Sequence, residues 1–75
     1  MVSVRDRIVV DRRVMGGKAV VRGTRISVDF ILELLANGWS VDDIVREYPA
    51  LSREDVLAAL KYAAKVLRNE VVIRA

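Results

Sequence analysis

The sequence contains no cysteine and no histidine. Disulfides and thiolate metal sites are therefore excluded, and the commonest general base and metal ligand of proteins is missing. No nucleophile–base pair of the usual kinds can be assembled, and the adjacent carboxylates Asp42 and Asp43 would point about 100° apart on a helix. The sequence predicts a protein that is not an enzyme and that holds no cofactor or metal.

Proline and long apolar runs are also scarce. There is a single proline, and unbroken apolar runs are only a few residues long, so neither a signal peptide nor a membrane span is expected. We expect a soluble, cytoplasmic protein. At 75 residues the chain is near the lower limit for a self-sufficient core, yet 53% of its residues are hydrophobic. A domain this small cannot hide so much apolar surface, so we expect a homodimer.

Positive charge is concentrated at the start of the chain. Residues 1–25 hold seven bases and two acids, whereas residues 26–75 hold six bases and eight acids. The basic segment has two interpretations: it meets the phosphates of a nucleic acid, or it pairs with the acidic body of a partner subunit. The sequence leaves both open.

Residues 1–26 are predicted to form a basic β arm. Within residues 7–11, the β-branched residues 8–10 are flanked by the charged Arg7 and Asp11, as is typical of a strand. A turn at Gly16–Gly17 and a second extended segment from Ala19 follow, and Gly23 is predicted to have a positive φ. The arm therefore turns back on itself before the helices begin.

The turn over residues 22–25 also has two interpretations. Either it binds an anion through backbone N–H and guanidinium groups, or it fixes the arm against the helices, with its arginines paired to Asp29 or Glu33. The Walker pattern of a phosphate loop is absent and the local signal is weak, so the structural interpretation is favoured.

Three helices are predicted within residues 27–75. Ser27, Ser40 and Ser52 are the expected N-caps, Gly38 ends the first helix, and Pro49 ends the second. A short second helix with a tight turn into a longer third is the outline of a helix-turn-helix bundle.

The third helix is predicted to bury one apolar stripe, and the chain is predicted to end in a short strand over residues 71–73. The stripe consists of Val56, Leu60, Ala63 and Leu67, widened by Leu57 and Ala64.

Four segments together resemble the domain-of-unknown-function family 433. The resemblance covers residues 7–68 in order. The segments are Gly17-Lys18-x-Val20-Val21-Arg22-Gly23-Thr24-Arg25-Ile26-x-Val28, Leu34-Leu35-Ala36-Asn37-Gly38, Ile44…Tyr48-Pro49-x-Leu51, and Val56-x-Ala58-Ala59-Leu60-x-Tyr62-Ala63.

The resemblance implies a mainly α fold, a three-helix homeodomain-like helix-turn-helix bundle preceded by a short β arm, and a dimer. It also implies an antitoxin that is encoded beside a PIN-like nuclease toxin and represses its own operon. We expect inhibition by occlusion, in which arginines cover the acidic metal site of the toxin. The candidates are Arg12 and Arg13 if the arm does this, and Arg68 and Arg74 if the tail does.

Duplex DNA is the second expected partner. The predicted third helix begins with Glu54 and Asp55, which repel phosphate, so most contacts are expected from the arm. Lys61 belongs to a basic stripe with Lys65 and Arg68 that either follows a phosphate backbone or is a solvated helix face. The residues predicted to contact DNA are Arg5, Arg7, Arg12, Arg13, Lys18, Arg25, Arg53 and Lys61.

Two aromatic residues are candidates for partner binding. Trp39 is either an interface anchor or a hydrophobic staple with Ile44 over the joint between two helices. Tyr62 is either part of the core rim or a dimer contact. Besides the antitoxin, the sequence leaves two alternatives open: a stand-alone DNA-binding regulator and a non-catalytic dimerisation module.

Overall fold

The chain begins with a β hairpin preceded by one turn of helix. The computed structural model describes residues 4–10, 12–13 and 15–68. Within these residues, helix α1 (Val4–Arg7) leads directly into strand β1 (Ile8–Val10). After the 3-10 turn η1 (Met15–Gly17), strand β2 (Ala19–Val21) returns antiparallel, so that Ile8 lies opposite Val21. The two predicted extended segments are confirmed as a short antiparallel pair of strands. Helix α1 was not predicted, because four residues are too few to show a helical period.

The glycines at the turns have the backbone that their positions require. Gly16 and Gly17 reverse the chain between the two strands with φ of 70° and 92°, values that side-chain-bearing residues adopt only with strain. Gly23 has φ of 78°, as predicted, in the turn that leaves β2. Gly38 has φ of 95° and follows the C-cap Asn37 of the first long helix, which is the expected end of that helix.

Three longer helices follow, and each begins one residue after its predicted cap. They are α2 (Val28–Ala36), α3 (Val41–Glu47) and α4 (Arg53–Leu67). Ser40 and Ser52 form full capping boxes: each serine Oγ accepts from an aspartate N–H three residues on, and that aspartate accepts from the serine N–H. Ser27 accepts from the N–H of Phe30. The starts of all three helices were therefore readable from local sequence.

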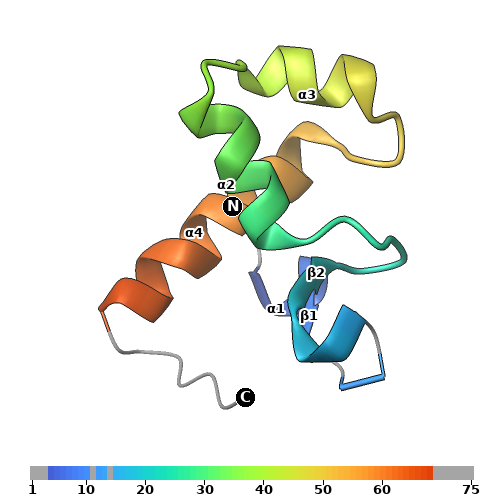
Figure 1. The fold of residues 1–75 in the computed structure, drawn as a ribbon, viewed down its shortest axis with the longest axis vertical. Helices are drawn as coiled ribbons and strands as arrows, with labels where there is room; N and C mark the ends of the chain where they lie inside the picture. Colours follow the sequence, from blue (N-terminus) through green and yellow to red (C-terminus); the bar gives the residue numbers. More distant parts are fainter. Residues whose placement is uncertain (1–3, 11, 14, 69–75) are drawn as a thin grey trace.

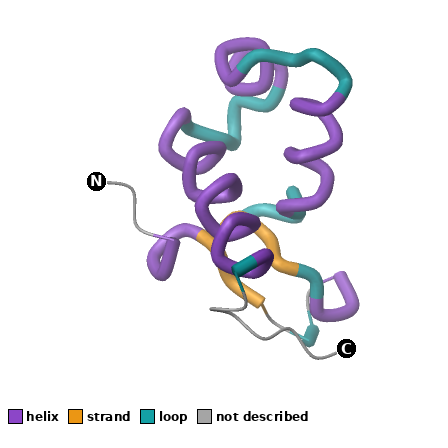
Figure 2. Tube along the Cα trace, turned by 90° about the vertical axis from the view of Figure 1, so that its left-hand side faces the viewer, coloured by secondary structure: helices purple, strands orange, loops and turns teal. Residues whose placement is uncertain are grey.

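The helices and the hairpin enclose one hydrophobic core. Figure 1 places α3 at one end of the molecule and the hairpin at the other, and Figure 2 shows the strands below the helices from the side. Helix α4 contacts α1, β1, α2 and α3, so it is the element around which the others pack. The most deeply buried large side chains are Val20, Val21, Ile31, Ile44 and Val56.

The predicted buried stripe of α4 is wrong in part. Val56 is fully buried, but Leu60 is 39% exposed and Leu67 is 83% exposed. The buried face instead contains Ala58, Ala59 and Tyr62, and the small alanines let neighbouring elements approach the helix closely. Helix α4 has apolar residues on two faces, and periodicity alone does not say which of them the domain covers.

The fold is therefore mainly helical, with three longer helices and a two-stranded antiparallel sheet. The short strand predicted over residues 71–73 lies outside the described residues. Among the residues that the structure describes, no helix is long and apolar enough to cross a membrane.

Candidate partner and nucleic-acid interface

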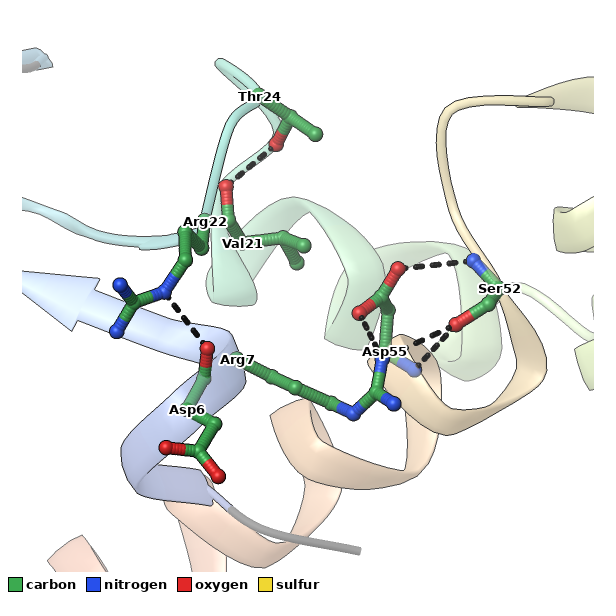
Figure 3. Close-up of polar contacts among 7 residues, drawn as sticks. All are labelled: Asp6, Arg7, Val21, Arg22, Thr24, Ser52 and Asp55. Atoms are coloured by element: carbon green, nitrogen blue, oxygen red, sulfur yellow. Dashed lines mark hydrogen bonds and ion pairs between the residues drawn. The ribbon is translucent and has the colours of Figure 1, made fainter.

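An ion pair connects the start of the hairpin to the start of α4. Arg7 Nη1 donates to Asp55 Oδ1 at 2.9 Å and lies 3.4 Å from the Oγ of Ser52 (Figure 3). The Asp55 side chain is 13% exposed and that of Arg7 37%. Because the same carboxylate completes the capping box of α4, one aspartate both caps a helix and holds the β arm against it. Arg7, predicted to contact DNA, thus has a structural role within the domain.

The environment of Asp55 favours its ionised form. Burial acts to raise the pKa of this carboxyl, but the hydrogen bond from the Ser52 backbone N–H and the Arg7 guanidinium outweigh it. The pKa of Asp55 is therefore held below its ordinary value of 3.8. The carboxylate–guanidinium pair is intact at neutral pH.

The turn over residues 22–25 is fixed by hydrogen bonds within the chain. Arg22 Nε donates to the Asp6 carbonyl at 2.7 Å, and Thr24 Oγ1 donates to the Val21 carbonyl at 2.8 Å (Figure 3). Thr24 Oγ1 also accepts from the N–H of Ile26 at 3.0 Å. These bonds support the structural interpretation of the turn. Asp29, for which an arginine partner was predicted, accepts from Lys18 Nζ at 3.2 Å.

An open hollow of about 550 Å³ lies beside this turn and the start of α2. Lys18, Arg25, Asp29 and Glu33 line it together with Phe30, whose ring is apolar and 40% exposed. The Lys18–Asp29 pair is exposed and contributes little to stability, so it can be exchanged for a partner's charges. The hollow therefore offers charges of both signs beside one aromatic ring to a protein surface.

Two of the three remaining bases of the arm lie in the hairpin loop. Arg12 and Arg13 are exposed in the turn between β1 and β2. Arg5 belongs to α1, and its side chain lies outside the described part of the structure. The structure thus brings Lys18 and Arg25 together at the hollow and leaves Arg12 and Arg13 at the tip of the hairpin.

The predicted contacts from the helices are arranged differently. Arg53, at the start of α4, donates from Nη1 to Asp42 Oδ1 at 3.1 Å and so bridges α4 to α3. Both side chains of this pair are well exposed. Lys61 is exposed on α4. Both bases belong to α4 and not to the hairpin. Arg53 lies in the first turn of this helix together with two carboxylates, Glu54 and Asp55.

Trp39 lies in the loop between α2 and α3 and is half-buried. Its ring packs against the core cluster that contains Ile44, and its centroid is 6.3 Å from that of Tyr48. The Phe30 ring meets Tyr48 edge-on at 5.5 Å. These contacts support the staple interpretation. The outer edge of Trp39 lines a second open hollow, of about 510 Å³, together with Asn37, Gly38, Asp43, Arg46 and Glu47. The role of Trp39 as an interface anchor stays a prediction.

Tyr62 is a core residue. It is 7% exposed, and burial raises the pKa of its phenol. Its burial supports the core interpretation of this tyrosine, and its role as a dimer contact stays a prediction. Arg68 is the exposed C-cap of α4, and Arg74 lies outside the described residues.

Two features of this surface escaped sequence reasoning. The Arg7–Asp55 pair joins residues 48 positions apart, so no local sequence pattern predicts it. The exposure of Phe30 was not predicted, because this residue is adjacent in sequence to the apolar residues Ile31 and Leu32 of α2. Within the residues that the structure describes, no group of three or more acidic side chains is arranged to hold a metal ion.

Residues 8–63 match the family described as "Protein of unknown function (DUF433)". The chain belongs to this family. Its structure is similar to the crystal structure of a DUF433 member protein from Anabaena variabilis ATCC 29413, with a TM-score of 0.79 and 29% sequence identity. The similarity covers 88% of this chain and 65% of that one, so the chain spans somewhat less than two thirds of its relative. No curated protein matches the sequence.

Proposed function

We propose that this DUF433 protein is antitoxin-like: it binds a PIN-like nuclease and inhibits it by covering its active site. The observation that favours this is the placement of Arg12 and Arg25, which are exposed on tight turns at the hairpin end of the domain. Arg7 and Arg53, in contrast, bridge elements of the domain. The family resemblance supplies the identity of the nuclease.

The proposed inhibition rests on charge and on a rigid turn. A metal-dependent nuclease gathers carboxylates in its active site, and a guanidinium can bind such carboxylates through two parallel hydrogen bonds. Arg25 follows a turn that is fixed through Thr24 and Arg22, so little backbone freedom is lost on binding. Arg12 and Arg13 at the hairpin tip are further candidates for covering the active site of the nuclease. Arg68 and Arg74 are the candidates at the other end of the chain.

Co-purification with the product of the adjacent gene tests this proposal. We expect the tagged chain to retain that nuclease, and we expect the triple variant Arg12→Ala, Arg13→Ala, Arg25→Ala to lose it. The matched control Arg46→Ala, Lys65→Ala removes the exposed charge of Arg46 on α3 and the half-buried charge of Lys65 on α4, and it should retain the nuclease. Failure of the wild-type chain to retain any nuclease contradicts the proposal.

A second function, binding of operator DNA, follows if α3, the turn after it and α4 form the helix-turn-helix of a homeodomain-like bundle, as the family resemblance implies. The start of α4 is poorly suited to read bases, because Glu54 and Asp55 lie there and Arg53 faces Asp42. We therefore assign the phosphate contacts to the hairpin and the following turn. The bases in question are Arg12, Arg13, Lys18 and Arg25.

The salt dependence of duplex binding tests this assignment. Affinity falls as salt rises, and each lost phosphate contact reduces the magnitude of the slope of log affinity against log salt by about 0.9. Replacing the four bases by alanine is expected to lower the slope by about 2 to 4, whereas Arg46→Ala should leave it nearly unchanged. An unchanged slope in the fourfold variant contradicts DNA binding through the arm.

A further inference from the structure

Helix α4 has a second apolar stripe that the described residues leave partly uncovered. Leu60 and Leu67 are 39% and 83% exposed, and Leu57 and Ala64 on the same side are half-buried. In Figure 1 the carboxyl-terminal half of α4, orange to red, projects past the rest of the bundle. Solvent exposure of leucines at helical spacing is unfavourable in a protein that already has a complete core on the opposite face of the helix.

The spacing of this stripe fits another helix. Leu57, Leu60, Ala64 and Leu67 are separated by three, four and three residues, which is the a/d pattern of a two-helix seam. The stripe runs from Leu57 to Leu67, a length of about 15 Å within the 15-residue helix α4. In such a seam, the small Ala64 of one helix accommodates Leu60 of the other, so the two backbones can approach closely.

Charges beside the stripe indicate which helix covers it. Glu54 and Arg68 lie on the same flank, 14 residues apart, at opposite ends of α4. When two copies of α4 run antiparallel, Glu54 of each copy lies near Arg68 of the other, and the helix dipoles also oppose each other. Lys61 lies near the two-fold axis, where its flexible stem lets the two ammonium groups separate into solvent.

We infer that α4 is the homodimer interface, in which two copies of this chain pack antiparallel through Leu57, Leu60, Ala64 and Leu67. Leu57 of one copy lies against Leu67 of the other, and Leu60 lies against Ala64. The self-complementary flank makes a second copy the occupant that this surface fits best. The high hydrophobic content of a 75-residue chain agrees with a face that is covered by association.

The molar mass in solution tests the interface. A single chain has a mass of 8.4 kDa, and light scattering across a dilution series is expected to give twice this mass at high concentration. The variant Leu60→Glu, Leu67→Glu is expected to be monomeric at every concentration, with unchanged helical circular dichroism. Val10→Glu is the matched control, because Val10 is also apolar and exposed, at 52%, but lies on β1. It should remain dimeric.

The orientation can be tested because the chain has no cysteine of its own. In the antiparallel register, position 67 lies about 15 Å from position 67 of the second copy, beyond the reach of a disulfide, whereas positions 57 and 67 are adjacent. A mixture of Leu57→Cys and Leu67→Cys chains is therefore expected to cross-link on oxidation, and neither variant should cross-link alone. Cross-linking of Leu67→Cys by itself overturns the antiparallel arrangement.

The remaining outcomes also decide the inference. A wild-type chain that is monomeric at all concentrations overturns it, whether the stripe is covered by residues 69–75 or by another protein. A dimer that survives Leu60→Glu, Leu67→Glu places the interface elsewhere and overturns it as well. These results concern self-association only, so they are independent of whether a nuclease or DNA binds the hairpin.

Discussion

At the scale of single residues, Asp55 connects the two halves of the domain. Its carboxylate accepts from the Ser52 N–H at 2.9 Å, which caps α4, and from Arg7, which precedes β1. Since the Asp55 side chain is only 13% exposed, removal of Arg7 leaves this carboxylate without its charged partner in a half-buried setting. The position of the basic arm relative to the helices therefore depends on Arg7.

Arg7→Ala is expected to lower the free energy of unfolding by about 1–2 kcal/mol, because Asp55 loses a charged hydrogen bond in a half-buried setting. Arg12→Ala, which removes an exposed guanidinium from the hairpin turn, should change it by less than about 0.5 kcal/mol. Chemical denaturation of both variants measures the difference. Equal effects of the two substitutions would show that the Arg7–Asp55 pair does not stabilise the fold.

The lowered pKa of Asp55 predicts a loss of stability in acid. A carboxyl whose pKa is lower in the folded than in the unfolded chain stabilises the protein fully above its ordinary value of 3.8, and this stabilisation is lost as the pH falls through the folded pKa. Asp43 acts in the same direction, because the N–H and hydroxyl of Ser40 lower its pKa. We expect the free energy of unfolding to fall below about pH 4.

Denaturation between pH 2 and pH 7 measures this dependence. Asp55→Asn is expected to flatten part of the acid slope, since Asp43 and Asp29 still contribute. A wild-type stability that does not decrease in acid would contradict the assignment of lowered pKa values to these carboxyls.

At the scale of elements, local signals fixed the helix boundaries and distant contacts fixed their packing. The caps at Ser27, Ser40 and Ser52 were predictable because each involves groups only three residues apart. The end of α2 at Gly38 was predictable because its backbone has a positive φ that glycine tolerates. These features are encoded within a single turn of chain.

The packing face of α4 was not predictable in the same way. Its sequence contains two apolar stripes, and the longer side chains of Leu60 and Leu67 suggested the wrong one. The domain instead packs against Ala58, Ala59 and Tyr62, because close approach of neighbouring elements favours small residues on that face. The candidate site shares this difficulty: which arginines pair within the domain depends on contacts such as Arg7–Asp55 that join distant parts of the chain.

Substitutions on the two faces of α4 should therefore affect different properties: folding stability on the buried face and dimerisation on the exposed face. Ala59→Leu adds volume at a fully buried position and is expected to cost about 1–3 kcal/mol of folding stability. Leu60→Ala, on the uncovered face, should alter the stability of the isolated chain much less, although it weakens the proposed dimer. Denaturation at low protein concentration separates the two effects, and a large loss for Leu60→Ala there would contradict the orientation of α4.

At the scale of the whole molecule, the protein presents two separate surfaces. The hairpin tip and the turn at Arg25 display exposed bases, and the outer face of α4 displays exposed leucines. In our account, the first surface binds the nuclease or DNA and the second joins two copies of the chain. A dimer of this kind would present two basic surfaces and would raise the avidity for a paired target.

Inhibition is tested most directly by titrating the proposed partner, a nuclease encoded by the neighbouring gene, with the purified chain while RNA cleavage is followed. We expect cleavage to decline in proportion to added protein and to cease when the nuclease is saturated, whereas the Arg12→Ala, Arg13→Ala, Arg25→Ala variant should inhibit much more weakly. Cleavage that continues undiminished in the presence of excess wild-type chain would contradict the account.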